Sequence, residues 1–298
     1  MFAFLRSFMS RKIAIVTDSN SNILPEEGLE QGVYVLPMPF LINGKPYLEN
    51  VNLSQEEFYR LIDEQASIST SQPSIGDVTE LWTELLKTYD EILHIPMSSG
   101  LSNACATAQS LAKDFEGKVQ VVDNHRIAVL LKASILDAVK LRDEGKTAAE
   151  IKEYLEKTGN DASIYITVDT MKYLKRGGRI TPTAAMIGGI LKIKPVLQIH
   201  GSTLDKYALA RSMMKAKETM KAAIKQDLET RFSKYYANGE IRLCMAYTGN
   251  DNAAKIYAEE LKKDFPDLPI HFCAPLSLSV ACHVGPDALG LGVVRVLK

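Results

Sequence analysis

The stretch KIAIVTDS, at Lys12–Ser19, sets the pattern for the first half of the chain. Its apolar run ends abruptly in polar residues, which predicts a short buried strand that stops at about Asp18. Similar segments at Glu91–Ile95 and Lys118–Val122 are separated from it by segments with helical patterns. Because strands that alternate with helices favour a parallel sheet covered on both faces, we expect a three-layer α/β arrangement here.

The second half of the chain has a different pattern. Two strand-like segments, Lys192–Ile199 and Thr203–Leu209, are joined by a Gly201-Ser202 turn, which predicts a hairpin. The segments that follow predict a basic helix at Ser212–Thr230, a helix at Asn252–Asp264, and strands at Ile241–Tyr247, Ile270–Cys273 and Gly292–Leu297. A hairpin beside crossover units favours a mixed sheet.

Length and pattern together predict two domains, since 298 residues are long for one compact core. We expect an α/β protein with an N-terminal extension at residues 1–11, a parallel-sheet domain at residues 12–170 and a mixed-sheet α/β domain at residues 171–298. A strand expected at Ser163–Val168 is the last element of the first domain.

Charge and composition argue against several classes of function. The net charge is −1, although Met171–Lys225 contains twelve Lys or Arg and two acids. With a net charge near zero and no helix-turn-helix pattern, we expect no nucleic-acid partner. The four cysteines have no metal-like spacing, so we expect no metal site. No apolar run approaches the roughly 20 residues of a membrane span, and the expected location is the cytoplasm.

The familiar catalytic signatures are missing, because the sequence has no Walker A loop, GxGxxG, GxSxG or HExxH motif. Two hydroxyl-rich segments remain. Ser67–Ser74 is expected to be a loop between helices, and Pro96–Asn103 follows a strand and leads into a helix. The carboxyl ends of parallel strands and the N-termini of helices suit anionic ligands. Ordinary capping and turn formation explain the same residues, so both interpretations stay open.

Two further motifs have structural and functional interpretations. His283 lies in ACHVGP at Ala281–Pro286, which we expect to be an apolar strand. A single His there is more often a packing residue, although Gly285-Pro286 gives its ring a fixed direction. The RGGR motif at Arg176–Arg179 predicts a turn whose guanidinium groups suit either solvent or a carboxylate or phosphate ligand.

Five motifs in a fixed order resemble those of one bacterial family. They are Val16–Ser19 (VTDS), Thr70–Ser74 (TSQPS), Ser98–Ser102 (SSGLS), Arg176–Arg179 (RGGR) and His283–Pro286 (HVGP) with Ala288–Gly290 (ALG). Each motif alone is common. Together, in this order, they resemble the DegV family, the fatty-acid-binding subunits of bacterial fatty acid kinase. The resemblance extends from Lys12 to Lys298.

The resemblance implies a ligand, a partner and a location. In this family two α/β domains enclose one long-chain fatty acid, and the protein presents the carboxylate to an ATP-dependent kinase that forms an acyl phosphate. The chain would be a carrier in phospholipid metabolism, with no catalytic residues and no cofactor besides the bound fatty acid. It would be cytoplasmic and peripheral to the inner membrane surface, which it would touch transiently.

The resemblance also implies roles for particular residues. The expected ligand-binding residues are Thr70, Ser71, Ser102, Asn103, Arg179 and His283; the expected contacts to the kinase or membrane are Arg176 and Arg211. Thr70 and Ser102 correspond to hydroxyls that bind the carboxylate, and Arg179 and His283 to the network behind it. Two departures stand out: Asn103-Ala104 replaces the usual Gly-Thr, and Asp287 replaces a usual Gly, which would add negative charge near His283.

Physical chemistry supports a carrier and leaves rivals open. Each buried methylene contributes about 0.8 kcal/mol, whereas a buried carboxylate needs partners. One rival is a serine-dependent hydrolase or acyltransferase that uses Ser102 and His283, although the sequence identifies no orienting carboxylate. A regulator that binds DNA through the basic segment ranks lower. That segment suits either docking on anionic lipid or plain solvation.

Overall fold

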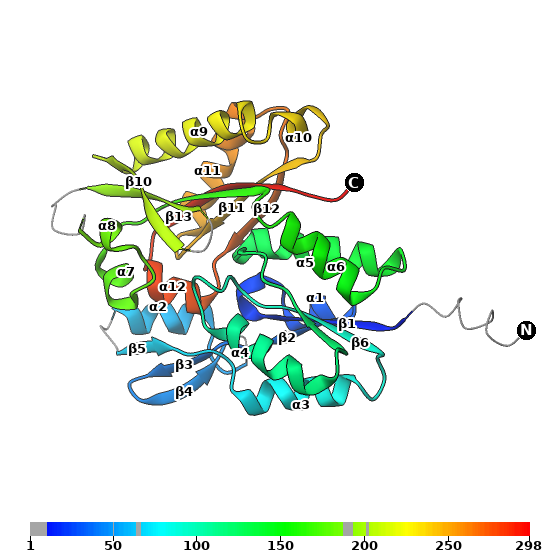
Figure 1. The fold of residues 1–298 in the computed structure, drawn as a ribbon. Helices are drawn as coiled ribbons and strands as arrows, with labels where there is room; N and C mark the ends of the chain where they lie inside the picture. The colour runs from blue at the N-terminus through cyan, green and yellow to red at the C-terminus, as the bar shows by residue number, and fades with distance from the viewer. Residues whose placement is uncertain (1–10, 50, 64–66, 187–192, 201–202) are drawn as a thin grey trace, which may run out of the picture.

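The computed structural model describes residues 11–49, 51–63, 67–186, 193–200 and 203–298. Figure 1 shows two lobes, each built on a β-sheet, with helix α5 (Ala128–Asp143) between the two sheets. The Gly201-Ser202 turn, the start of the strand predicted from Lys192, and all of the predicted extension except Arg11 lie outside the described residues.

The first sheet has four parallel strands in the order β2-β1-β6-β7. They are β1 (Ile13–Asp18), β2 (Val33–Leu36), β6 (Glu91–Ile95) and β7 (Val119–Val121). One face is covered by α3 (Ile75–Leu85) and α4 (Ala104–Leu111), and the other by α1 (Pro25–Leu29), α5 and α6 (Ala148–Lys157). Every residue of β1 is buried as a result. The predicted three-layer arrangement is confirmed.

The second sheet has six strands in the order β10-β9-β8-β13-β11-β12. They are β8 (Ala162–Thr167), β9 (Lys194–His200), β10 (Thr203–Ala210), β11 (Ile241–Tyr247), β12 (Ile270–Pro275) and β13 (Leu289–Arg295). Only β11 and β12 pair in parallel, so the predicted mixed sheet is confirmed.

The two faces of the second sheet have different neighbours. The outer face is covered by α9 (Met213–Glu229) and α11 (Asp251–Asp264), with α10 (Ser233–Ala237) beside α9. The inner face looks onto α5, which contacts β11 and β13 as well as β1. Ten of the sixteen residues of α5 are buried, because this helix is packed between the two sheets.

A small antiparallel sheet joins the two lobes on one side. It consists of β3 (Pro39–Ile42), β4 (Lys45–Leu48) and β5 (Ile68–Thr70) in the order β4-β3-β5. Helices α2 (Gln55–Asp63) and α12 (Leu278–Val284) pack on it around Phe40 and Phe58. The nearby α7 (Lys172–Gly177) contacts α12, and α8 (Pro182–Ala185) follows. A C-terminal helix is therefore held against an N-terminal sheet.

Three expectations about these elements were wrong. Ser67–Ser74 is not all loop, because Ile68 is buried and β5 pairs with β3. Ala162–Thr167 is not the last strand of the first domain, because it pairs with β9 and β13 in the second sheet. A boundary at residue 170 is therefore too late for this strand. His283 is not on a strand but on α12.

Membrane and metal features were searched over the described ranges only. Within them, no helix combines the length and apolar character needed to cross a bilayer. In the same part of the chain, no group of three or more His, Cys, Asp or Glu side chains has a metal-binding arrangement.

Candidate functional site

A cavity of about 380 Å³ lies between α5, the inner face of the second sheet and helix α12. Its volume is in the range of about 300–1,000 Å³ that is common for small-molecule sites. Residues after β6 of the first sheet, such as Met97 and Ser102, and residues of β13 in the second sheet line it, so it lies between the two lobes. Most of its lining is apolar, and the polar side chains gather at one end.

The apolar part of the cavity has a floor and a roof. Alternate residues of a strand point to the same face of its sheet. The floor is therefore formed by two residues from each of β8, β13 and β11. These residues are Ile164, Ile166, Gly290, Gly292, Cys244 and Ala246. The roof is the first turn of α5, at residues 127–130. Small side chains on β11 and β13 leave a trough beneath this helix.

The polar end brings together all six predicted ligand-binding residues. The cavity lining includes Thr70, Ser71, Ser102, Asn103, Arg179 and His283. Arg176 and Arg211 are exposed and do not line the cavity. The six residues come from β5 and the segment after it, the entry to α4, the segment after α7, and α12, so only the tertiary fold brings them together.

His283 and Thr70 form the central contact of this end. His283 Nε2 lies 3.0 Å from Thr70 Oγ1 in a hydrogen bond. Burial lowers the pKa of His283 to about 4, and the positive charges of Arg179 and Arg176 act in the same direction. The imidazole is therefore neutral at pH 7. Its buried Nδ1 has no hydrogen-bond partner among the described residues.

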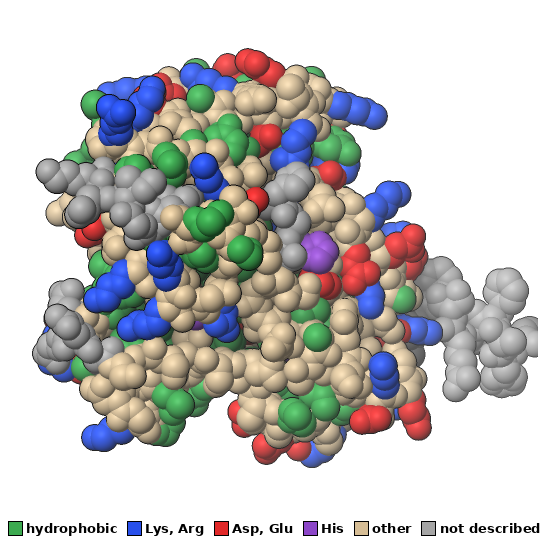
Figure 2. All heavy atoms as spheres, turned by 60° about the vertical axis from the view of Figure 1, so that its left-hand side comes forward, with side chains coloured by type: hydrophobic (Ala, Val, Ile, Leu, Met, Phe, Trp, Pro, Cys, Tyr) green, Lys and Arg blue, Asp and Glu red, His purple; other side chains and the backbone are tan. Residues whose placement is uncertain are grey.

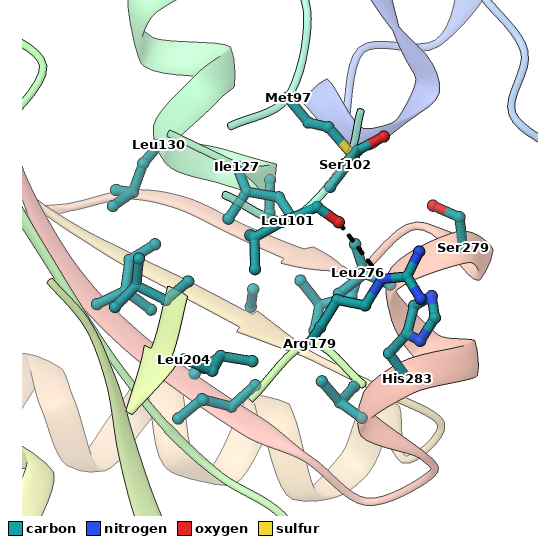
Figure 3. A pocket seen from close by; sticks show the side chains of 18 of the residues that line it. Met97, Leu101, Ser102, Ile127, Leu130, Arg179, Leu204, Leu276, Ser279 and His283 are labelled. Carbon is teal, nitrogen blue, oxygen red and sulfur yellow. Dashed lines mark hydrogen bonds between the residues drawn. The ribbon is translucent and has the colours of Figure 1, made fainter. Parts of the chain in front are cut away.

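Arg179 ties the end of α7 to the loop after β6. Its Nη1 donates to the carbonyl of Gly177 at 2.5 Å, and its Nε donates to the carbonyl of Leu101 at 3.4 Å. Figure 3 shows the guanidinium beside the imidazole of His283, with Ser102 on the opposite side of Leu101. The exposed guanidinium supplies positive charge at the polar end of the cavity.

The segment Ser98–Asn103 follows β6 and enters α4, as predicted. The amide of Ser102 donates to the carbonyl of Ser98 at 3.2 Å, and its Oγ accepts from the amide of Ala104 at 3.1 Å. Asn103 precedes α4 without a side-chain capping bond, and it is exposed. Since His283 bonds Thr70 rather than Ser102, this geometry does not favour the hydrolase or acyltransferase alternative.

Sequence reasoning missed a buried network behind the polar end. Glu49 is 3% exposed, and its carboxylate accepts from Ser19 Oγ at 2.5 Å and from the amide of Leu278. Burial raises the pKa of Glu49 to about 7, and the neighbouring Asp18 acts in the same direction. Nothing in the sequence around Glu49 signals this role, because its partners are distant in the chain.

The same network reaches the cavity wall. The carboxylate of Asp18 accepts from the amide of Met97 at 2.9 Å, and burial raises its pKa. Asn20 Oδ1 accepts from the hydroxyls of Ser277, at 2.8 Å, and Ser279. Met97 and Ser279 line the cavity. Asp18 of the VTDS motif and the following Asn20 therefore hold two cavity-lining residues from behind.

A second polar pair was also missed. Gln72 Nε2 donates to Thr107 Oγ1 at 3.1 Å, and both residues line the polar end. Gln72 belongs to the TSQPS motif, and Thr107 lies one turn into α4. This pair connects the two hydroxyl-rich segments.

Asp287 has a conformational role in place of the expected electrostatic one. Its φ is 56°, in the left-handed region that favours glycine. The charges that shift the pKa of His283 are those of Arg179 and Arg176, so the expected effect of the Asp287 charge on His283 is not seen.

We expect Asp287→Gly to stabilise the protein by up to about 1 kcal/mol, because it removes the backbone strain at this position. Urea denaturation measures the change, and a less stable variant would contradict it.

Comparison with known proteins places this site in context. The family model described as "Uncharacterised protein, DegV family" matches residues 12–296. A DegV domain-containing protein from Deinococcus radiodurans is 30% identical over 282 residues, which cover 94% of this chain and 98% of that protein.

Two solved structures are similar along almost their full length. A DegV family protein from Thermus thermophilus, described by its fatty acid binding, has a TM-score of 0.84 and 28% identity, and the match covers 96% of this chain and 100% of that one. DegV from Bacillus subtilis, described as a fatty acid binding protein, has a TM-score of 0.83 and 26% identity with the same coverage of 96% and 100%.

Proposed function

The chain belongs to the DegV family, and from this premise we propose that it binds one long-chain fatty acid in the cavity between its lobes. The observation that carries the proposal is the division of the cavity into a long apolar part and one polar end. The acyl chain would lie between α5 and the sheet, with its carboxylate beside Thr70 and Ser102.

Different residues would stabilise the acyl chain and the carboxylate of such a ligand. Each methylene removed from water contributes about 0.8 kcal/mol, so an acyl chain contributes on the order of 10 kcal/mol before the cost of immobilising it. A carboxylate without partners costs several kcal/mol on burial. Hydroxyls at Thr70 and Ser102 and the charge of Arg179 offset this cost.

The neutral His283 would direct the hydroxyl of Thr70. If the imidazole proton is on Nε2, the ring donates a hydrogen bond to Thr70 Oγ1. The hydroxyl of Thr70 can then donate its own hydrogen bond to the carboxylate of the ligand. This tautomer also leaves the unpartnered Nδ1 as an acceptor without a proton, which spares the cost of a buried N–H without a partner. His283 is therefore a positioning residue in this scheme.

We propose further that the protein presents the bound carboxylate to an ATP-dependent kinase, as a carrier subunit with no chemistry of its own. The polar end of the cavity supports this, because α7, which contacts α12, carries the exposed basic residues Lys172, Lys175 and Arg176, and the exposed Arg179 follows it. Figure 2 looks onto this side of the molecule, where Lys and Arg side chains gather near hydrophobic ones. Such a surface suits a kinase or, transiently, the anionic inner surface of the membrane, from a cytoplasmic location.

Native mass spectrometry of the protein purified from cells tests the binding proposal. We expect an adduct that extraction identifies as a long-chain fatty acid, and a protein that neither carries nor takes up fatty acid would overturn the binding proposal.

To test the carrier role, the loaded protein is incubated with ATP and the kinase. Acyl phosphate is then trapped with hydroxylamine as a hydroxamate, and absence of hydroxamate with an active kinase would overturn that part alone.

Thr70→Val is expected to weaken fatty-acid binding by about 1–3 kcal/mol, or about 5- to 150-fold, because a valine keeps the shape and removes the hydroxyl. Isothermal titration with one fatty acid measures this change. Thr167→Val is the matched control, since the buried Thr167 hydroxyl has no hydrogen-bond partner in the described part of the chain and Thr167 does not line the cavity. Equal affinities in the two variants would show that the carboxylate is held elsewhere.

A further inference from the structure

A second, smaller hollow lies directly behind the cavity. Its polar lining includes His125, Arg126, Asn160, Ser163 and Arg231. Three apolar residues line both hollows: Leu130 from α5, Ile164 from β8 and Ile199 from β9. We call these three residues the partition, because they separate the apolar cavity from the polar hollow.

The partition lies at the end of the cavity away from the polar site. Figure 3 shows Leu130 on the opposite side of the cavity from His283 and Arg179. Ile164 and Ile199 are direct partners in the pairing of β8 with β9, so their side chains share one face of the sheet. Gly292 pairs with Ile164 on the neighbouring strand β13, and a Cβ at this position would be 3.5 Å from Leu130 Cδ1 and 3.6 Å from Ile164 Cγ1.

The chemistry changes sharply across the partition. Arg126 is 3% exposed, and its guanidinium donates to the carbonyls of Thr158 and Gly159 at 2.6 and 3.2 Å. Arg231 donates to Ser163 Oγ at 2.9 Å. A methyl end that entered this hollow would face groups already committed to hydrogen bonds and would displace their hydration without compensation. An apolar chain therefore has no favourable continuation past the partition.

We propose that Leu130, Ile164 and Ile199 set the longest acyl chain that the protein accepts, by stopping the methyl end at the partition. The inference rests on the proposed function, because it assumes that a fatty acid occupies the cavity with its carboxylate at Thr70 and Ser102. The head-group residues then determine whether a fatty acid binds, and the partition determines its length.

Affinity measured across a series of saturated fatty acids of increasing length tests the proposal. Ile164→Ala removes the outer carbons of one partition residue and makes room for about two or three further methylenes. We expect the affinity of the wild type to fall beyond a certain acyl chain length. For the two methylenes beyond that length, we expect the affinity of the variant to rise about fourfold per added methylene. Ile199→Ala is expected to act in the same direction, and it covers the case in which one variant fails to fold.

Ile166→Ala is the matched control. Ile166 lies two residues along the same strand on the same face and lines only the apolar cavity, so its loss widens the middle and leaves the partition closed. We expect its length limit to equal that of the wild type. Leu130→Phe enlarges a partition residue and is expected to shift the limit to shorter chains.

The outcomes separate the two proposals. A wild type that binds no fatty acid of any length contradicts the proposed function. A wild type that binds fatty acid, with the same length limit in Ile164→Ala, Ile199→Ala and Leu130→Phe, contradicts the role of the partition alone. A limit that moves equally in Ile166→Ala would show that total volume, rather than the partition, sets the length.

Discussion

Replacing Gly177 with Ala is expected to break the hydrogen bond between Thr70 and His283 and to weaken fatty-acid binding about tenfold or more. A Cβ at Gly177 would lie 2.1 Å from His283 Nδ1 and 3.1 Å from its Cε1 and Cγ. The 2.1 Å distance is too short for any real contact, so either the imidazole turns away or α7 separates from α12. The neighbouring Ala281 and Cys282 are packed against the small sheet, so this part of α12 is held in place.

The adjacent glycine is a matched control. Gly178 has a φ of 68° and ends α7 in the left-handed conformation, but a Cβ there would meet open space. Gly178→Ala is therefore expected to cost about 1 kcal/mol of stability and to leave the imidazole in place. Titration with fatty acid, together with ¹⁵N shifts of the His283 ring, distinguishes the two variants. Equal affinity in both would show that the contact of α7 with His283 does not matter for binding.

The strengths of the sequence predictions have a physical origin. The KIAIVTDS stretch has helices on both faces, so its apolar run is continuous and its pairing partners have the same pattern. The six expected ligand-binding residues came from the family resemblance rather than from local pattern, and the structure places all six on one cavity.

The errors occur where distant residues decide the local structure. His283 lies in a short apolar segment that suits either a strand or a helix, and the helical form is selected by packing of Leu278 and Ala281 on the small sheet. Ile68–Thr70 was assigned to a loop from its composition, yet it pairs with β3. Glu49 could not be found at all, since its partners are 30 and 229 residues away in the sequence.

Glu49→Gln is expected to remove a pH dependence of stability that the wild type has between about pH 4.5 and pH 7. Burial raises the pKa of Glu49 from 4.5 to about 7 in the folded protein, so between these values the folded state holds a proton that the unfolded state has released. The free energy of unfolding contributed by this group therefore falls as pH rises through this window, by about 3 kcal/mol, and is constant above it. Gln does not titrate and has no such loss.

Other buried groups also titrate in this region, so the comparison must be a difference between two proteins. Burial raises the pKa of Asp137 to about 6, which gives a loss of the same sign. Burial lowers the pKa of His94 to about 3 and of His283 to about 4, and both therefore favour the folded state more as pH rises toward 6.5. All three groups are present in the wild type and the variant, and they cancel in the difference. Asp18 does not cancel fully, because it interacts with Glu49 directly.

Glu49→Ala separates the charge of this residue from its hydrogen bonds. Ala leaves both Ser19 Oγ and the Leu278 amide without their acceptor, and we expect a loss of about 2–4 kcal/mol at every pH. Because Leu278 begins the helix that carries Ser279 and His283, this variant should also bind fatty acid more weakly, whereas Glu49→Gln keeps an acceptor and should bind normally. Urea denaturation from pH 4 to pH 8 measures both stabilities. Parallel curves for the wild type and Glu49→Gln would show that the carboxylate does not carry a proton into the folded state, and normal binding by Glu49→Ala would show that α12 is held in place without it.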